Sequence, residues 1–187
     1  KNHHIMASAG ILEDMFSGVG GELLYHQFDR RWAVGTSYSF VRQRGYDKSF
    51  KHLDYTTSTG FLSLFYASPF YNFDFGLHAG RYLAGDVGYT FEAKRSFDSG
   101  FEVGAFFTRT NVSAQDFGEG SFDKGLLIRI PFDYFSSRNT TGAFRTTLRS
   151  INRDGGRRLD DFTSMLWNDR RAYRLDALQR TQRRMIP

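Results

Sequence analysis

Apolar and polar side chains alternate, residue by residue, along most of this chain. Residues 71–80 read Tyr-Asn-Phe-Asp-Phe-Gly-Leu-His-Ala-Gly, and the same pattern recurs in segment after segment. Successive side chains of a β-strand point to opposite faces, so each segment predicts a strand with one apolar face and one polar or small face. The fold class is therefore all-β. What remains to be decided is whether the apolar face meets lipid or a dry core.

About nine or ten strands are expected. The candidate segments are 4–16, 21–29, 31–43, 54–67, 70–80, 83–95, 100–109, 122–135 and 142–151. Short connections near 29–30, 68–69 and 98–100 alternate with long polar ones at 44–54 and 111–121, whereas the connection at 80–83 is short where a long one is due. This alternation is typical of an up-and-down barrel with brief turns on one membrane side. Segment 54–67 is atypical because both of its faces carry apolar residues.

Three features favour lipid. The segments run to ~10–13 residues, close to the ~9–11 that cross a bilayer at a tilt. The less hydrophobic face of each segment is rich in Gly, Ala and Ser with isolated charges, which suits a narrow polar lumen. Residues placed for an aromatic girdle at the interface are Trp32, Tyr71, Tyr89 and Tyr134. We expect an antiparallel up-and-down transmembrane β-barrel, or part of one. A soluble barrel that holds an apolar ligand is an alternative.

The pattern changes after about residue 152. Residues 153–158, Arg-Asp-Gly-Gly-Arg-Arg, predict a turn, and residues 161–184 contain neither Gly nor Pro and carry apolar residues at helical spacing. Residues 138–187 hold twelve Arg and five Asp, a net charge of +7, whereas residues 1–137 hold thirteen basic and fifteen acidic residues, a net charge of −2. We therefore divide the chain into a barrel segment, 1–152, and an Arg-rich turn with a basic helical tail, 153–187.

Two sets of candidate functional residues follow, one from the polar positions that alternate along the strands and one from the basic tail. The polar residues expected to line the lumen are Asp74, His78, Asp86, Glu92, Lys94, Glu102 and Arg129. Those expected to dock a partner, a polymer or lipid phosphates are Arg153, Arg157, Arg158, Arg170, Arg171, Arg183 and Arg184. No cofactor or metal is expected, because the chain has no cysteine and the adjacent His3 and His4 would point to opposite faces of a strand.

One set of residues raises the alternative of an enzyme. His78 shares a face with Asp74, and a serine such as Ser63 on a neighbouring strand would complete the residue types of a hydrolytic triad. No Gly-x-Ser-x-Gly elbow accompanies them. We expect no catalytic residues. An outer-membrane lipid-modifying acyl hydrolase or transferase, with Ser and His in the barrel wall, is kept as the alternative.

Two motifs carry a family resemblance. Residues 126–133, Leu-Leu-Ile-Arg-Ile-Pro-Phe-Asp, are followed some twenty residues later by 153–159, Arg-Asp-Gly-Gly-Arg-Arg-Leu, and together they resemble the carboxy-terminal part of the YjbH/GfcD family. The resemblance implies an outer-membrane β-barrel encoded with exopolysaccharide or capsule secretion genes of Gram-negative bacteria, with no enzyme activity to transfer. Members of that family are several times longer than this chain and contain more than one barrel unit. A fragment, or a barrel half that a partner closes, is therefore implied.

The expected function is that of a non-enzymatic outer-membrane component that assists export or surface assembly of an exopolysaccharide or capsule. Expected partners are outer-membrane lipid, the polysaccharide, other export proteins, and the rest of a longer chain or a partner that completes the barrel. A first residue other than Met also suggests a mature product or a piece of a longer protein. Nucleic acid is not expected, because the excess Arg lies in one terminal segment without a zinc-finger, Walker or ribonucleoprotein motif.

Overall fold

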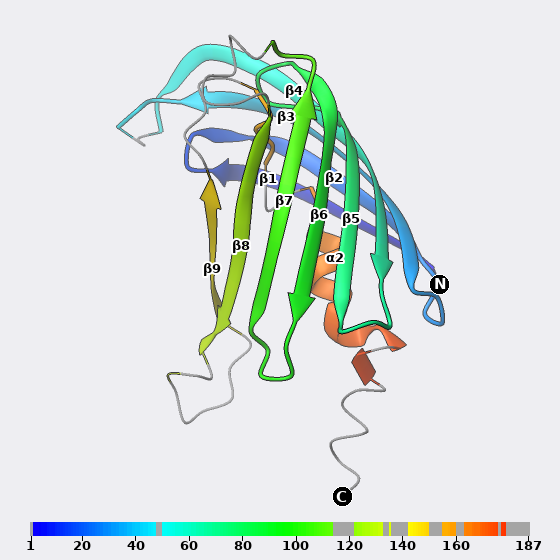
Figure 1. Cartoon of the computed structure of the whole chain (residues 1–187). Helices are drawn as coiled ribbons and strands as arrows, with labels where there is room; N and C mark the ends of the chain where they lie inside the picture. Colours follow the sequence, from blue (N-terminus) through cyan, green and yellow to red (C-terminus); the bar gives the residue numbers. More distant parts are fainter. Residues whose placement is uncertain are drawn as a thin grey trace, which may run out of the picture.

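The computed structural model describes residues 2–47, 50–113, 122–132, 135, 142–149, 155–159, 163–175 and 177–178. The strands among them are β1 (His3–Glu13), β2 (Phe16–His26), β3 (Trp32–Arg44), β4 (His52–Ala67), β5 (Phe73–Arg81), β6 (Val87–Ser96), β7 (Glu102–Thr110), β8 (Asp123–Pro131) and β9 (Ala143–Arg149). Each strand pairs antiparallel with the next, which makes one nine-stranded sheet in chain order (Figure 1). The predicted all-β antiparallel fold is confirmed.

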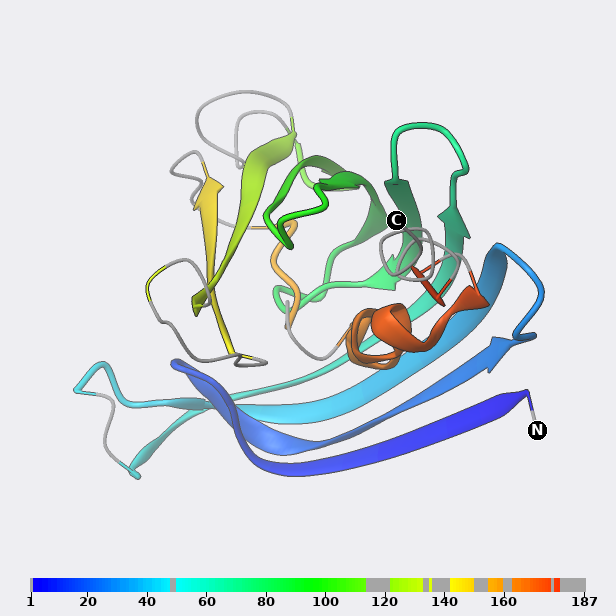
Figure 2. The ribbon, with the colours of Figure 1, turned by 90° about the horizontal axis from the view of Figure 1, so that it is seen from below.

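The sheet is strongly curved, and the described residues of the C-terminal segment, 155–159 and 163–175, lie on its concave side (Figure 2). Within the described residues no pairing joins β9 to β1, so the sheet is an open trough. Of the up-and-down barrel that the sequence predicts, the antiparallel order of nine strands in one sheet is confirmed. Closure of the barrel stays a prediction.

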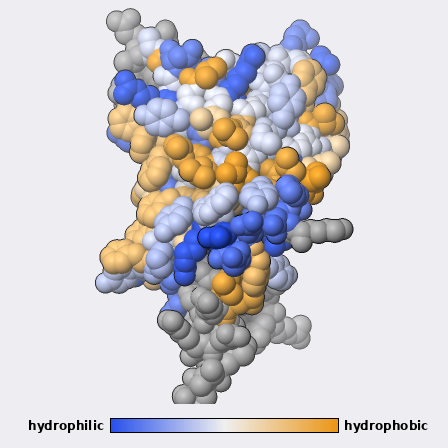
Figure 3. All heavy atoms as spheres, turned by 90° about the vertical axis from the view of Figure 1, so that its right-hand side faces the viewer, coloured by the Kyte–Doolittle hydropathy of each residue, from blue (hydrophilic) through white to orange (hydrophobic). Residues whose placement is uncertain are grey.

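The convex face is apolar and exposed, whereas the concave face is largely polar and buried. In β3, Val34, Tyr38 and Phe40 are exposed, while the intervening Ser37 and Ser39 are buried. Buried polar residues recur across the sheet, and they include Glu22, Thr59, Ser63, Asp74, His78, Thr90, Glu92, Thr108 and Asp123. Figure 3 shows hydrophobic residues gathered in a band between more hydrophilic ends. The alternation in the sequence thus places apolar residues on the outside of the trough.

The residues expected in an aromatic girdle are all exposed where the structure describes them. Trp32, Tyr71 and Tyr89 are 41%, 60% and 40% exposed. Tyr134 lies outside the described residues. Their position in the chain is compatible with a membrane interface, and that role stays a prediction.

The first hairpin turns earlier than the sequence predicts. Its turn lies at residues 14–15, and Gly18 and Gly20 lie inside β2. A Cβ atom at Gly18 would overlap the backbone carbonyl oxygen of Phe40 in β3. These glycines therefore permit close approach of two strands, although a Gly-rich run in a sequence usually indicates a turn.

The predicted helical tail appears among the described residues as two short elements, α2 (Met165–Asp169) and η3 (Arg170–Tyr173). Trp167 of α2 is 2% exposed, and its ring stacks on that of Phe65 with the centroids 5.1 Å apart. Leu24, Ala33 and Ala67 complete this cluster. The tail thus explains why β4 is apolar on both faces, because its inward Phe65 packs against Trp167. The division of the chain at residue 152 stays a prediction.

Among the residues that the structure describes, no helix is long and apolar enough to cross a membrane.

Candidate functional site

Glu92 of β6 is the centre of a buried charged cluster on the concave face. Its carboxylate pairs with the guanidinium of Arg158, which comes from the tail. Lys94 Nζ lies 3.2 Å from Glu92 Oε2, and His78 Nε2 lies 3.9 Å from Oε1. Glu92 is only 3% exposed, and a buried carboxylate is tolerated only with such partners.

Asp74 of β5 forms a second cluster with the tail. Arg174 Nη2 donates to both carboxylate oxygens of Asp74, at 3.1 and 3.0 Å. The same guanidinium lies over the ring of Trp167, 4.2 Å from its centroid. Arg171 Nε lies 3.6 Å from Asp74 Oδ2. The tail is therefore held on β5 by charge and by packing together.

Glu102 of β7 is shared by two arginines. Arg171 Nη1 pairs with its Oε1, and Arg129 Nη1 of β8 lies 3.4 Å from the same oxygen. Arg129 Nη1 also donates to the Gly100 carbonyl at 2.9 Å. One carboxylate thus faces two cations, of which Arg171 is shared with Asp74.

Backbone groups of the tail add further contacts with the sheet and its loops. Gly156 N donates to Asp86 Oδ2 at 2.8 Å, and Leu166 N donates to Glu22 Oε2 at 3.1 Å. The Arg157 carbonyl accepts from the backbone N–H of Leu83 at 2.8 Å. Residues 156–159 and 163–174 therefore lie across the concave face, and we call these two described stretches together the strap.

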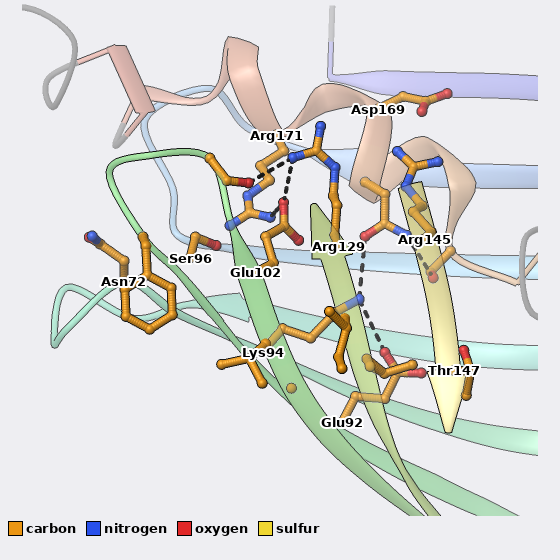
Figure 4. Close-up of a pocket in the computed structure, with 18 of the residues that line it drawn as sticks. Asn72, Glu92, Lys94, Ser96, Glu102, Arg129, Arg145, Thr147, Asp169 and Arg171 are labelled. Carbon is orange, nitrogen blue, oxygen red and sulfur yellow. Dashed lines mark hydrogen bonds and ion pairs between the residues drawn. The ribbon is translucent and has the colours of Figure 1, made fainter. Parts of the chain in front are cut away.

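Beneath the strap, the side chains of β6–β9 and the tail line a cavity of about 700 Å³ (Figure 4). Charged residues in its wall are Glu92, Lys94, Asp98, Glu102, Arg129, Arg145, Arg158, Asp169 and Arg171. Figure 4 shows Glu102, Arg129 and Arg171 close together, whereas the Lys94 side chain points toward Glu92. Its volume falls in the range of about 300–1,000 Å³ that is usual for small-molecule sites.

The structure brings most of the predicted lumen residues together. Asp74, His78, Glu92, Lys94, Glu102 and Arg129 lie on the concave face, whereas Asp86 lies in the loop between β5 and β6. Their role as lumen-lining groups stays a prediction. The pairing of these residues with the tail was not predicted from the sequence. The contacts of Arg174 with Asp74 and of Glu22 with the backbone of Leu166 were not predicted either. The sequence feature that could have indicated this pairing is the opposite net charge of residues 1–137 and residues 138–187.

The predicted docking arginines divide into three groups. Arg158 and Arg171 face inward and form ion pairs within the chain. Arg170 Nη1 lies 3.2 Å from His4 Nδ1, and the side chain of Arg157 is exposed. Arg153, Arg183 and Arg184 lie outside the described residues. Docking stays a prediction for the set.

Ser63 and His78, the residue types of the enzyme alternative, are in contact. Ser63 Oγ lies 2.8 Å from His78 Nδ1. Both are buried, at 1% and 0% exposure, and neither belongs to the described wall of the cavity. The Ser63 hydroxyl is thus shielded from any substrate in this conformation, and the bond serves as a link between β4 and β5.

A hydroxyl chain links the β5–β6 loop to the sheet. Tyr82 Oη lies 2.7 Å from Thr90 Oγ1, which lies 2.6 Å from Thr108 Oγ1, and all three residues are buried. Burial raises the pKa of the Tyr82 hydroxyl. Tyr82 therefore stays protonated and retains a hydrogen-bond donor for the chain.

The geometry so far defines a curved antiparallel sheet that is apolar outside, polar inside and crossed by an arginine-rich strap. A family model described as exopolysaccharide biosynthesis protein YbjH matches residues 1–168. The chain therefore belongs to the YjbH family, as its motifs indicated.

An uncharacterized lipoprotein, YjbH of Escherichia coli (strain K12), is 41% identical over 155 residues, which are 80% of this chain and 22% of that protein. The chain thus spans less than a quarter of that relative's length. No solved structure matches the chain.

Proposed function

We propose that this chain forms part of the wall of an outer-membrane β-barrel that assists export or surface assembly of an exopolysaccharide, and that it catalyses no reaction. The observation that carries the proposal is the placement of apolar residues on the exposed convex face and polar residues on the buried concave face. In water, a large apolar surface of this kind is unfavourable, whereas beside lipid it is the expected arrangement. Membership of an exopolysaccharide biosynthesis family supports the choice of polymer.

The two sheet edges support a wall with further strands. Among the described residues, β1 and β9 each pair on one side only. Backbone groups left unpaired in hydrocarbon cost several kcal/mol each, so a membrane sheet needs every edge paired. We propose that the rest of a longer chain, or a partner, supplies the missing strands. The much greater length of the Escherichia coli relative supports a longer chain.

Leu126 and Leu127 of β8 offer a matched test of the membrane location. Leu126 is 49% exposed on the convex face, whereas its neighbour Leu127 lines the cavity. A bimane label on Leu126→Cys or Leu127→Cys would be compared in the full-length protein, reconstituted into vesicles that contain brominated lipid. Strong quenching at position 126 and weak quenching at 127 are expected. Equal quenching, or a protein that is monodisperse without detergent, contradicts the proposal.

The role in export is tested in the producing bacterium. Removal of the gene is expected to lower surface polysaccharide several-fold, while enzymatic synthesis of precursors continues. Complementation with the full-length gene restores the surface polymer. Unchanged surface polysaccharide after removal argues against an export role.

A second candidate function, a lipid-modifying enzyme, is favoured by the hydrogen bond between Ser63 and His78. If the protein is an enzyme, it turns over phospholipid, and both His78→Ala and Ser63→Ala abolish this turnover while the variants still fold. Our proposal predicts no turnover by the unmodified protein. A soluble barrel for an apolar ligand is disfavoured, because the concave face carries carboxylates and arginines where such a ligand would lie.

A further inference from the structure

Arg145 of β9 is a cation with no carboxylate partner among the residues that the structure describes. It lines the cavity, and within the part of the chain that the structure describes its side chain makes no ion pair or hydrogen bond. The residue directly opposite on β8 is another arginine, Arg129. Like charges in directly opposite positions of a sheet destabilise it. An anion between the two guanidinium groups would remove this repulsion.

The nearby carboxylate does not balance this charge. Glu102 already pairs with both Arg129 and Arg171, and Arg171 also pairs with Asp74, so these two carboxylates are engaged by arginines other than Arg145. A guanidinium offers a planar pair of donors that matches a carboxylate, which gives short, charge-assisted hydrogen bonds. The cavity therefore has an electrostatic and geometric preference for a carboxylate-bearing ligand.

The remainder of the wall suits a sugar. Ser96, Thr147 and Asn168 supply hydroxyl and amide groups, which donate to and accept from ligand hydroxyls. Tyr173 lies at the wall and is 69% exposed, so its ring is available to stack against a pyranose. A volume of about 700 Å³ is enough for a short oligosaccharide.

We propose that this cavity binds an acidic saccharide, with Arg145 and Arg129 holding its carboxylate. The proposal rests on the export function and deepens it, because it states that the polymer carries carboxylated sugars. A lipid phosphate is the other source of an anion. The cavity, however, lies on the concave side, whereas lipid in the proposed arrangement contacts the convex side.

Isothermal titration calorimetry of the full-length protein in detergent tests the site with trigalacturonate as probe. Maltotriose, a neutral sugar with the same number of rings, is the ligand control. Trigalacturonate is expected to bind at least tenfold more tightly than maltotriose, and added salt is expected to weaken its binding. Arg145→Gln is expected to weaken it by about tenfold, the factor for loss of one charged hydrogen bond.

The chain supplies a matched control and a second variant. Arg30→Gln changes an exposed arginine of the β2–β3 loop that does not line the cavity, and it is expected to leave binding unchanged. Thr147→Trp places a large ring in the cavity and is expected to block binding without removal of a charge. An unchanged thermal unfolding midpoint for Arg145→Gln shows that its effect is local.

Three outcomes overturn the site. They are equal binding by the unmodified protein and Arg145→Gln, equal affinity for maltotriose, and equal affinity for inorganic phosphate, which marks a general anion site. If these occur while removal of the gene still lowers surface polysaccharide, the cavity assignment fails and the export role stands. If removal of the gene leaves the polymer unchanged, the export role fails whatever the probe binds.

Discussion

Asp74 and Arg174 lie one hundred positions apart in the chain and share two hydrogen bonds at 3.0 and 3.1 Å. Glu92 and Arg158 make a similar connection across sixty-six positions. In each pair the acid belongs to a strand of the concave face and the arginine to the tail. Such buried pairs add little net stability over an apolar core, but removal of one partner leaves an uncompensated charge. Without the strap, Asp74 and Glu92 would therefore lose the arginines that balance their charges.

Asp74→Ala is expected to lower the free energy of unfolding by about 3–5 kcal/mol, because Arg174 would then be buried without a counter-charge. The measurement is equilibrium urea unfolding of the full-length protein in detergent. Asp54→Ala is the matched control, because its ion pair with Arg42 is exposed. No measurable change is expected for the control, and equal effects of the two changes contradict the structural role of Asp74.

At the scale of elements, α2 and η3 are too short to be stable alone, since isolated helices need roughly 12–15 residues. They are held in place by the concave face, through the packing of Trp167 on Phe65 and the ion pairs of Arg171 and Arg174. The strands of the sheet, in contrast, hold one another through continuous ladders from β1 to β9. The strap therefore depends on the sheet more than the sheet depends on the strap.

Trp167→Ala is expected to release the strap, because loss of a buried tryptophan costs about 3–5 kcal/mol. Limited trypsinolysis is expected to cleave at Arg170 or Arg171 faster than in the unmodified protein. Tyr173→Ala, a change at a 69% exposed ring of the same segment, is expected to leave the cleavage rate unchanged. A strap that stays equally protected in Trp167→Ala argues against this packing as its anchor.

Leu64 of β4 tests the environment of the convex face. It is 50% exposed, and its neighbours in register are Val34 and Leu77. An arginine at this position should cost about 2–4 kcal/mol near the midplane of a bilayer, whereas an exposed position in water would accept it. Unfolding of Leu64→Arg from vesicles is expected to show this loss, with Tyr46→Arg in the β3–β4 loop as control. Equal stability of the two variants contradicts contact with lipid.

On the scale of the whole molecule, the described sheet is a trough with an apolar outside and a polar inside. Residues 1–137 have a negative net charge and residues 138–187 a positive one, and individual ion pairs join acids of the sheet to arginines of the strap. Closure of the trough would remove both free edges, as in barrels generally. The strap and the cavity would then lie within the barrel.

Hydrogen exchange of the full-length protein tests closure. Backbone amides of β1 and β9 are expected to be protected to the same degree as those of the central β4 and β5. In a closed barrel each of these amides has a partner on a neighbouring strand, whereas at an open edge the unpaired amides exchange fast. The backbone amide of the exposed Tyr71, in the β4–β5 loop, is the control for fast exchange. Fast exchange at alternate positions of β1 or β9 would show that these edges are open.

The sequence by itself determined the local facts of this protein. Period-two alternation is a property of neighbouring residues, so it predicted about nine or ten strands, their up-and-down antiparallel order, and one apolar and one polar face for most of them. Two local signals were ambiguous. The glycines of β2 resemble a turn, and the two-sided apolar pattern of β4 is explained only by the packing of Phe65 against Trp167.

Only the tertiary structure decided where the tail lies and which acids meet which arginines. Contacts such as Arg174 with Asp74 join residues one hundred positions apart, and no local pattern encodes a choice among several acids and several arginines. The cavity and the unmatched Arg145 follow from the same long-range arrangement. The alternation of side chains is decided within each strand, whereas the pairing of charges depends on the curvature of the whole sheet.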